Sequence, residues 1–503
     1  MGYQTELAEL RKFTEKIEYY NYTNNALIYW DKITYMPKNA IEYRSKVMSF
    51  LAGEQYKLVS DRNLQKLIRY FKGNSRNDIV TNATIKKLIV STENISAIPA
   101  EEYQEYVELI AVSEQIWAEA KEKNDFDSFR PYLVKIFDTF RKFAEYWGYE
   151  TEVYDALLEY YVEDLNVEIV DSLAKEIKPV LIELLGKVEE KNAAGEGPKK
   201  IEIGPVSCEK QQAVWKMILR KIGFDFDSGR IDIGSHPTIL TSSPDDVRVV
   251  NTFDENDFWG GIFNILHCGG RGVYKQSIDR NLMGTLLAEV PSFAMEEAVG
   301  RFYENIIGRS RGFWHYIYEP LTEILPELNE YTAQDLYESV NHAQPTLIRM
   351  DADELTYLLH VIIRYEVEKD IIDRKLRVSE LPGEWAEKYE EYLGIRPEND
   401  KDGVLQDIHW AAGYIGYFPS YLMANVMAAQ LAAIMSEEIG DLNEIMLNDE
   451  FYKINEWLTT NIYSAGSIYS SRELVENACK GEISSKAYTD YLRNKFSEVY
   501  KLI

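Results

Sequence analysis

The chain has 503 residues, 46% hydrophobic and 27% charged, and a net charge of −28 at pH 7. These fractions are typical of a globular protein with a sizeable core. The strong negative charge excludes a nucleic-acid-binding protein, because phosphates need a basic surface, and it disfavours anionic membranes. We therefore expect neither a nucleic-acid partner nor a membrane partner.

Cysteine is rare, and the first residues resemble no export signal. Cys208, Cys268 and Cys479 show no CxxC spacing, so the sequence predicts neither a thiolate zinc module nor a disulfide framework. The opening segment, MGYQTELAELRKF, lacks a basic stretch followed by an apolar one. We expect a cytoplasmic protein.

Helical periodicity dominates residues 1–200. Apolar side chains from Leu7 to Ile17 recur at the spacing of one helix face, and a second such stripe runs from Ile169 to Leu184. The segment KNAAGEGPKK, residues 191–200, is rich in Gly and Lys and predicts a surface loop.

Strand-like segments are confined to residues 201–253. There the chain carries IEIG, GRIDIG, TILTSS and DVRVVNTF, each bounded by Gly, Pro, Ser or Asp. Further on, GIRPENDKDG (394–403) predicts a loop and the apolar stretch 422–435 predicts a buried helix too short to span a bilayer. We predict one mostly α-helical domain over residues 1–503, with a helical part (1–200), a small β region (201–253) and a second helical part (254–503).

Residues 264–274 read NILHCGGRGVY and are patterned like the H-E-x-x-H helix of zinc peptidases. In that helix two His one turn apart bind the same zinc ion. Here His267 is the first His, Cys268 stands at the general-base position, and Arg271 stands at the second-His position. Arginine stays protonated and cannot bind a metal, and a thiol is a poor general base.

A second candidate segment is SFAMEEAVGRFYEN, residues 292–305, which places Glu296 and Glu297 on a predicted helix. Paired Glu residues most often form a solvated helix face, and a lone His is more often structural than metal-binding. Residue chemistry alone leaves two interpretations open: an ordinary helix pair, or the remains of a metal site.

Six further segments, in order along the chain, resemble the carboxypeptidase Taq family of zinc metallocarboxypeptidases. The resemblance implies a large helical fold with a small β-sheet beside the active-site helix, a deep central groove, and a homodimer. The segments are ALIYWDKITYMP (26–37), GFDFDSGRIDIGSHPT (223–238), DVRVV (246–250), LIRMDADELTY (347–357), GVLQDIHW (403–410) and GYFPSY (416–421).

The resemblance also assigns roles to single residues. His267 and Glu297 stand at two of the family's metal-ligand positions, and Arg271 occupies the third. Arg349 is implied to hold the terminal carboxylate of a peptide, for which a planar guanidinium is suited. The other residues implied to line the groove are Asp246, Arg248, His409 and Tyr417.

A competing interpretation applies to the segment around Arg349. Arg349, Asp353 and Glu354 can equally form a structural ion-pair network that never contacts a ligand. Both interpretations stay open at this point.

The departures from the family pattern fall on the chemistry. Two protein ligands do not replace the usual three plus water, so we expect no bound cofactor, neither zinc nor another divalent metal. The leading hypothesis is a pseudoenzyme that binds peptides or protein C-termini, or acts as an interaction scaffold. The alternative is an active metallocarboxypeptidase with a rearranged metal site that recruits His236 or His409. A third hypothesis is a hydrolase with Cys268 as nucleophile and His267 as base.

One structural consequence follows for the position of the metal. A carboxylate left there without a cation is costly when buried. We therefore predict that Arg271 forms an ion pair with Glu297, or with the neighbouring Glu296, in place of the metal.

Overall fold

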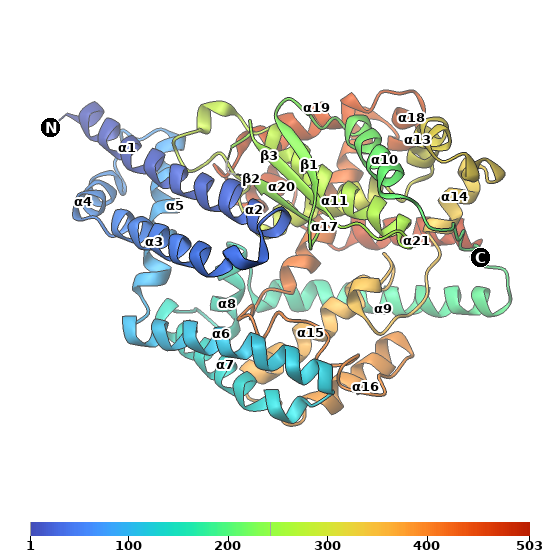
Figure 1. Cartoon of the computed structure of the whole chain (residues 1–503), viewed down its shortest axis with the longest axis horizontal. Helices are drawn as coiled ribbons and strands as arrows, with labels where there is room; N and C mark the ends of the chain where they lie inside the picture. The colour runs from blue at the N-terminus through green and yellow to red at the C-terminus, as the bar shows by residue number, and fades with distance from the viewer. Residues whose placement is uncertain (1, 242, 503) are drawn as a thin grey trace. The chain divides into compact units, whose positions relative to one another are not determined.

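The structure, a computed structural model, describes residues 2–241 and 243–502. As the sequence predicts, these residues form a mostly helical protein with a small sheet of three strands (Figure 1). No helix within these ranges combines the length and the apolar character needed to cross a membrane.

The chain divides into two compact units, each assembled from three separate stretches. Unit 1 comprises Met1–Glu93, Ile201–Tyr337 and Leu431–Glu482, and unit 2 comprises Asn94–Lys200, Glu338–Gln430 and Ile483–Ile503. Because both units are discontinuous, neither is a segment that can be cut out of the chain. The single domain over residues 1–503, with internal boundaries at 200 and 253, stays a prediction, as does the deep central groove.

Unit 1 begins with a group of helices that pack around a core of their own. The predicted stripe from Leu7 to Ile17 lies in the first helix, where Leu10 and Ile17 pack with Leu64 and Phe71. The elements are α1 (Tyr3–Tyr22), η1 (Thr23–Tyr29), α2 (Trp30–Thr34), η2 (Lys38–Ala40), α3 (Ile41–Val59), α4 (Arg62–Phe71) and α5 (Ile79–Ser96).

The sheet of unit 1 consists of β1 (Gly229–Ile233), β2 (Thr238–Thr241) and β3 (Val247–Asn251). The strand order is β1-β3-β2, with β3 parallel to β1 and antiparallel to β2. The central strand β3 is the most buried, and the sheet lies beside α11 (Phe258–Gln276) (Figure 1). This arrangement confirms three of the four predicted strand segments.

The fourth predicted strand, IEIG at residues 201–204, is wrong. These residues have irregular backbone, and the carbonyl of Ile201 accepts a hydrogen bond from the indole of Trp259 at 2.9 Å instead of pairing with a strand. The β region also contains a helix that the pattern did not predict, α10 (Cys208–Lys221), which begins where Ser207 caps the backbone N–H of Lys210.

The remaining elements of unit 1 are helical. They are η3 (Arg280–Leu282), α12 (Phe293–Arg301), η4 (Phe302–Ile307), α13 (Arg311–Ile324), η5 (Pro326–Glu330), α14 (Ala333–Val340), α18 (Leu442–Leu447), α19 (Tyr452–Asn461), η7 (Tyr463–Ala465) and α20 (Ser471–Cys479).

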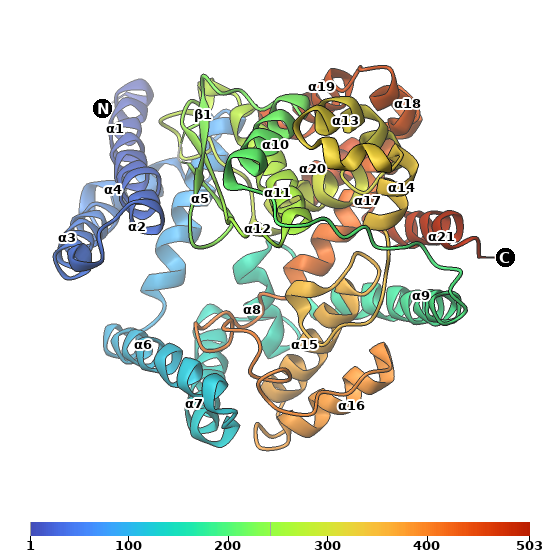
Figure 2. The ribbon, with the colours of Figure 1, turned by 45° about the vertical axis from the view of Figure 1, so that its right-hand side comes forward.

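Unit 2 is helical, and α6 and α7 lie side by side within it (Figure 2). The predicted stripe from Ile169 to Leu184 lies in α9, and the predicted loops at 191–200 and 394–403 lie almost wholly outside helices. The elements are α6 (Ala100–Lys123), α7 (Phe126–Trp147), α8 (Val153–Tyr161), α9 (Val167–Ala193), η6 (Arg349–Asp351), α15 (Tyr357–Ile372), α16 (Leu381–Leu393) and α21 (Lys486–Tyr500).

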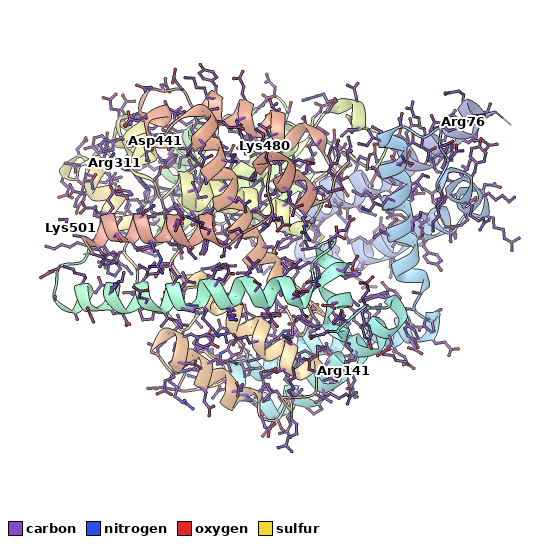
Figure 3. All side chains as sticks on the ribbon, turned by 180° about the vertical axis from the view of Figure 1, so that it is seen from behind. Arg76, Arg141, Arg311, Asp441, Lys480 and Lys501 are labelled. Atoms are coloured by element: carbon purple, nitrogen blue, oxygen red, sulfur yellow. The ribbon has the colours of Figure 1, made fainter. Side chains whose placement is uncertain are left out.

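The long helix α17 (Pro419–Ile439) and the exposed charged side chains involve both units. The apolar stretch 422–435 lies in α17, whose residues belong to both units. Charged side chains cover the exterior of each unit, and Arg76, Arg311 and Lys480 are exposed examples (Figure 3).

Candidate functional site

The HCGGR segment lies in the middle of α11, and its two glycines allow close helix packing. A Cβ atom on Gly270 would lie 2.3 Å from the ring of Tyr303, and one on Gly269 would lie 2.4 Å from a methyl group of Leu219. Any larger residue at either position would push η4 or α10 away from α11. The glycines therefore set how near the neighbouring helices come to His267.

The helix α12 brings two acidic side chains to α11. Ser292 caps its first turn by accepting a hydrogen bond from Met295. The side chains of Glu296 and Glu297 are only 12% and 4% exposed. The interpretation of Glu296 and Glu297 as a solvated helix face is therefore wrong, because both carboxylates point into unit 1.

His267 is held on both edges of its ring by carboxylates. Its Nδ1 lies 2.9 Å from Glu304 and its Nε2 lies 3.3 Å from Glu297. Arg301 joins the same two carboxylates, with 2.9 Å to Glu297 and 3.2 Å to Glu304, so the four side chains form a closed ring of contacts. The ring of His267 also packs against Gly300, where a Cβ atom would lie 2.5 Å away.

Electrostatics within this ring favour charged partners. Burial alone would lower the pKa of His267, but the charges of Glu297 and Glu304 outweigh it and raise the pKa. Burial alone would raise the pKa of Glu304, but Arg301 and His267 lower it to about 2. The pKa of Glu297 is lowered by the same kind of contacts, from His267 and Arg301.

Arg271 pairs with Glu296. Its Nη2 and Nε donate to the same carboxylate oxygen at 2.8 and 3.2 Å, and Lys275 lies 3.3 Å from that oxygen. These cations lower the pKa of Glu296 to about 2, although burial alone would raise it. The predicted pair between Arg271 and Glu297 is wrong, and the alternative partner Glu296 is confirmed.

Helix geometry explains why Arg271 pairs with Glu296 and not with Glu297. Successive residues project about 100° apart, so Glu296 and Glu297 cannot both face the same residue of α11. Glu296 faces Arg271, one turn beyond His267, whereas Glu297 faces His267 and meets Arg301 one turn later on its own helix. We call the seven side chains the His267 cluster: His267, Arg271, Lys275, Glu296, Glu297, Arg301 and Glu304.

The donor set of the His267 cluster does not fit a zinc ion. Glu304 and Glu297 lie on opposite edges of the imidazole ring, so only Glu297 shares the Nε2 side with a metal. His267 and Glu297 then give two protein ligands where catalytic zinc takes three. The guanidinium of Arg271 brings positive charge where the family has its second His.

Cys268 does not supply the missing chemistry. The side chain is buried, and burial raises the pKa of its thiol to about 12. A thiol with this pKa is neither an effective base nor a ready nucleophile at neutral pH. The geometry therefore opposes the hypothesis of a Cys268 hydrolase.

Two residues implied to line the groove, Asp246 and Arg248, are engaged with the amino-terminal helices of unit 1. Arg248 contacts both carboxylate oxygens of Asp246 at 2.9 Å, and Tyr22 donates to Asp246 at 2.6 Å. The guanidinium of Arg248 also lies 4.5 Å from the ring centroid of Trp30. The contacts found for this pair are thus structural ones that hold α1 and α2 to β3 and the residue before it.

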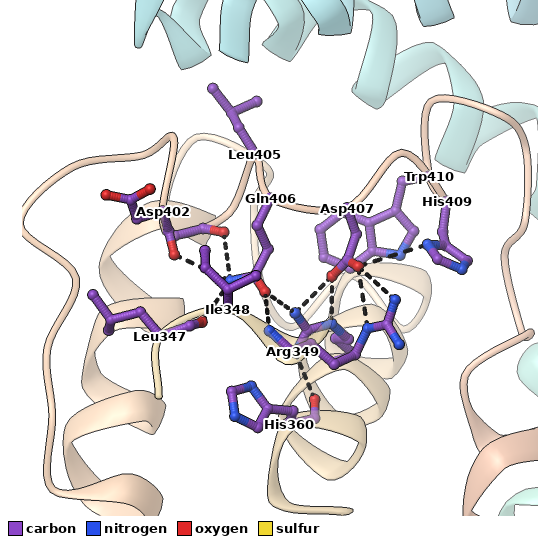
Figure 4. A network of polar contacts seen from close by, with 12 residues as sticks. Leu347, Ile348, Arg349, His360, Asp402, Leu405, Gln406, Asp407, His409 and Trp410 are labelled. Carbon is purple, nitrogen blue, oxygen red and sulfur yellow. Dashed lines mark hydrogen bonds and ion pairs between the residues drawn. The ribbon is translucent and has the colours of Figure 1, made fainter. Parts of the chain in front are cut away.

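Arg349 lies in unit 2, where it shares a carboxylate with a second arginine (Figure 4). Its Nε and Nη2 donate to Asp407 at 3.1 and 2.9 Å, while Arg364 donates to the other oxygen of Asp407 at 2.7 Å. The amide of Gln406 accepts from the backbone of Arg349 and from Arg364. The two guanidiniums hold the pKa of Asp407 far below its usual range, although burial alone would raise it.

His409 completes this group. Its Nδ1 lies 3.8 Å from Asp407, and its ring lies 5.5 Å from the ring of Tyr417 and 4.7 Å from that of Phe418. Burial lowers the pKa of His409 to about 4, against the attraction of Asp407. We call this group the Arg349 cluster: Arg349, Arg364, Gln406, Asp407 and His409.

The Arg349 cluster carries an excess of positive charge. Two guanidiniums share one carboxylate, and His409 is neutral at pH 7. The contacts found among the described residues account for three of the five N–H groups of Arg349, on Asp407 and Tyr357. One N–H on each terminal nitrogen is left for a further acceptor, and a carboxylate has two oxygens to match.

The competing ion-pair interpretation holds for the neighbours of Arg349. Glu354 pairs with Lys495 and accepts from Tyr491 at 2.7 Å, and Asp353 accepts from the backbone N–H groups of Leu355 and Thr356. Both therefore make structural contacts, whereas Arg349 pairs with Asp407 instead.

The sequence missed several residues that the structure brings into these clusters. They are Lys275, Arg301, Glu304, Arg364, Gln406 and Asp407. Four of them lie inside segments already singled out, RFYEN and GVLQDIHW, so the signal was present. Lys275 and Arg364 lie in none of these segments. Among the groove residues, the structure brings together Arg349, His409 and Tyr417 in unit 2, whereas Asp246 and Arg248 belong to unit 1.

Comparison with known proteins agrees with the sequence motifs. The sequence pattern described as carboxypeptidase Taq (M32) metallopeptidase matches residues 9–496. Carboxypeptidase 1 of Bacillus subtilis (strain 168) is 36% identical over 505 residues, which cover 99% of each chain. Thermostable carboxypeptidase 1 of Pyrococcus furiosus is 33% identical over 93% of this chain and 94% of its own.

Solved structures show the same likeness in three dimensions. The M32 carboxypeptidase from Deinococcus radiodurans R1 superposes with a TM-score of 0.95 at 31% identity, covering 99% of this chain and 100% of that one. The Pyrococcus furiosus carboxypeptidase superposes with a TM-score of 0.94 at 32% identity, covering 99% of both. The chain belongs to the carboxypeptidase Taq (M32) family of metallopeptidases.

Proposed function

We propose that this chain is a carboxypeptidase Taq family member in which ion pairs have replaced the metal centre, and that it binds peptide C-termini without hydrolysing them. The observation that carries the proposal is the pair between Arg271 and Glu296. It puts a salt bridge 2.8 Å long where the family has its second metal-binding His.

The charge balance of the His267 cluster supports the loss of the metal. Its three carboxylates face three permanent cations as well as a His whose pKa is raised. A dication added to this balanced group would be repelled by guanidiniums at close range. Without a metal no water is activated, and Cys268 supplies no carboxylate base.

The Arg349 cluster supports retained recognition of a peptide carboxylate. It combines an uncompensated positive charge with a guanidinium that is 6% exposed and has N–H groups left for an acceptor. A carboxylate that accepts two parallel hydrogen bonds from Arg349 would balance this charge. His409 and Tyr417 would contact the terminal residue of the peptide.

The rival proposal is an active metallocarboxypeptidase with a rearranged metal site. The names of the relatives, which are carboxypeptidases, favour it, as does His236, whose pKa is lowered by burial and by Arg271, so that its ring is neutral and able to bind a metal. The same proximity to Arg271 opposes it, because a metal bound by His236 would meet a fixed positive charge.

The experiment compares hydrolysis and binding on one set of peptides. A mixed pool of free-acid peptides is incubated with the protein, with zinc or cobalt added, and released amino acids are measured. We expect no release, although the same free-acid peptides bind and their C-terminally amidated forms do not. Chelator-sensitive release of C-terminal residues would establish the rival proposal. Equal binding of both peptide forms would show that no carboxylate is recognised.

Two other expectations stay predictions. The family resemblance predicts a homodimer, and the composition predicts a cytoplasmic protein. Sedimentation of the purified chain measures the first, and fractionation of cells that express it measures the second.

A further inference from the structure

Three polar side chains are fully buried on one face of α15: His360, Arg364 and Glu368. Their spacing of four residues places them one above another. Arg364 belongs to the Arg349 cluster, and His360 lies one turn before it with its Nδ1 2.9 Å from Tyr389. Glu368 has no part in the proposed function so far, although a carboxyl group is the costliest of these groups to bury without a cation.

Glu368 is held by three neutral donors. Tyr154 on α8 and the backbone N–H of Gly416 both donate to its Oε1 at 2.5 Å. The indole of Trp410 donates to its Oε2 at 2.5 Å. All of these contacts are buried inside unit 2.

Two of these donors belong to the segment that carries the recognition residues. We call residues 407–417 the recognition loop, because it contains Asp407, His409 and Tyr417. Helix α15 contacts this loop at two places. Arg364 donates a hydrogen bond to Asp407, and Glu368 accepts hydrogen bonds from Trp410 and Gly416. Figure 4 shows Asp407, His409 and Trp410 in the first part of this loop.

The backbone at the carboxyl end of the loop, around Gly416, is conformationally restricted. Gly416 has a φ of +85°, which other residues rarely adopt, and a Cβ atom there would lie 2.6 Å from the carbonyl oxygen of Leu157. Trp410 is wedged between Phe137 and Trp385, with ring centroids 5.9 and 6.0 Å away. The loop is therefore held by a small number of buried contacts, and two of them are the hydrogen bonds that Trp410 and Gly416 donate to Glu368.

We propose that Glu368 is a positioning residue for peptide recognition: its buried carboxyl group accepts hydrogen bonds from Trp410 and Gly416 and so holds the recognition loop in place. This inference rests on the proposed function, because the loop carries the residues that would contact the peptide.

Hydrogen exchange in the full chain without peptide tests this role directly. The readout is the protection of the Gly416 amide, and of the Tyr414 amide that donates to the carbonyl of His409 within the loop. Glu368→Leu removes the acceptor and should lower the protection of both amides at least about tenfold. Glu368→Gln keeps an acceptor oxygen and should retain most of the protection. The matched control is Glu366→Gln on the same helix, which faces Lys178 and Lys388 and should behave as the wild type. Unchanged protection in Glu368→Leu overturns the proposal.

A second pair of variants keeps Glu368 and changes its donors. Trp410→Phe removes a hydrogen bond that ties the loop to Glu368 and should lower the protection of the Tyr414 amide. Tyr154→Phe removes a donor that lies outside the loop and should lower this protection less. This test remains decisive if Glu368→Leu fails to fold. Unchanged protection in Trp410→Phe overturns the proposal.

Peptide binding separates this inference from the function on which it rests. Glu368→Leu should weaken binding of a free-acid peptide at least about tenfold, roughly one hydrogen bond to a charged group. Glu368→Gln should restore most of it, because the amide oxygen still accepts from Tyr154 and Gly416. Unchanged binding in Glu368→Leu overturns the positioning role. If the wild type binds no free-acid peptide, the proposed function fails, and the exchange result alone decides whether Glu368 holds the loop in place.

Discussion

The His267 cluster in unit 1 and the Arg349 cluster in unit 2 are built from the same kinds of groups, but their charges balance differently. In the first, three carboxylates meet three permanent cations and a His in a closed set of contacts. In the second, two guanidiniums meet one carboxylate. A balanced cluster needs no ligand, whereas a buried cluster with excess charge is stabilised by one.

The family motifs follow the same division. Three departures from the pattern, Cys268, Arg271 and Glu296, fall in or beside the His267 cluster, whereas the segments around Arg349 and Asp407 keep the pattern. Arg271 and Glu296 also compensate each other, since each supplies the charge that the other requires. This coupling is what distinguishes a remodelled site from a merely damaged one.

The largest effect is expected from removing one member of the balanced cluster. Glu296→Ala leaves Arg271 and Lys275 buried without their carboxylate and should lower the free energy of unfolding by about 3–5 kcal/mol. Denaturant unfolding measures this. Adding Arg271→Leu to Glu296→Ala should recover much of the loss, because the unpaired guanidinium is then removed. Additive losses in the double variant would contradict the coupling.

Acid should weaken the His267 cluster, because a protonated Glu296 no longer forms an ion pair with Arg271 and Lys275. The pKa of Glu296 is lowered from 4.5 to about 2 by Arg271 and Lys275, so its contribution is complete above the ordinary pKa and is lost as the pH falls toward 2. The loss is on the order of 3 kcal/mol for this group. Unfolding measured between neutral pH and about pH 3 should show a shallower decline in Glu296→Gln than in the wild type. Identical declines in Glu296→Gln and the wild type would show that Glu296 does not contribute to the acid sensitivity.

A smaller effect is expected in the Arg349 cluster, and on binding more than on stability. Arg349→Gln leaves Asp407 paired with Arg364, so the fold should persist. Binding of a free-acid peptide should weaken by about 2–3 kcal/mol, the loss for one member of a desolvated charge pair. Calorimetric titration measures this, with the amidated peptide as control. Equal affinity of wild type and Arg349→Gln would refute carboxylate recognition by Arg349.

The smallest effect is expected at the edge of the His267 cluster. Lys275 contacts Glu296 at 3.3 Å, but Arg271 already makes two hydrogen bonds to the same oxygen. Lys275→Met should therefore lower the free energy of unfolding by only about 1 kcal/mol. A loss as large as that of Glu296→Ala would mean that Lys275, rather than Arg271, is the main partner.

Much of the fold follows from local patterns in the sequence. Apolar periodicity predicts the helices that contain Leu7 to Ile17 and Ile169 to Leu184, and turn residues bound the three strands correctly. The segment at 201–204 has the composition of a strand, but no neighbouring strand pairs with it. Strand propensity describes a residue's fit to a sheet, and only tertiary structure decides whether the sheet is there.

The candidate sites were predictable in position and less so in detail. Motif spacing points to His267, Arg271 and Glu297, which lie in one cluster, but the choice between Glu296 and Glu297 depends on how α12 is rotated toward α11. The contact between Arg364 and Asp407 joins residues 43 positions apart and had no local signal. The two glycines of HCGGR make sense only once Leu219 and Tyr303 are seen beside them.

The central claim is that ion pairs have replaced the metal, and metal binding tests it most directly. Wild-type protein and the variant Cys268→Glu with Arg271→His are purified without chelators, titrated with zinc, and analysed for bound metal. The account predicts far less than one zinc per chain in the wild type and about one in the variant, which regains the second His. About one tightly bound zinc per wild-type chain, with Arg271 and Glu296 unchanged, would contradict it.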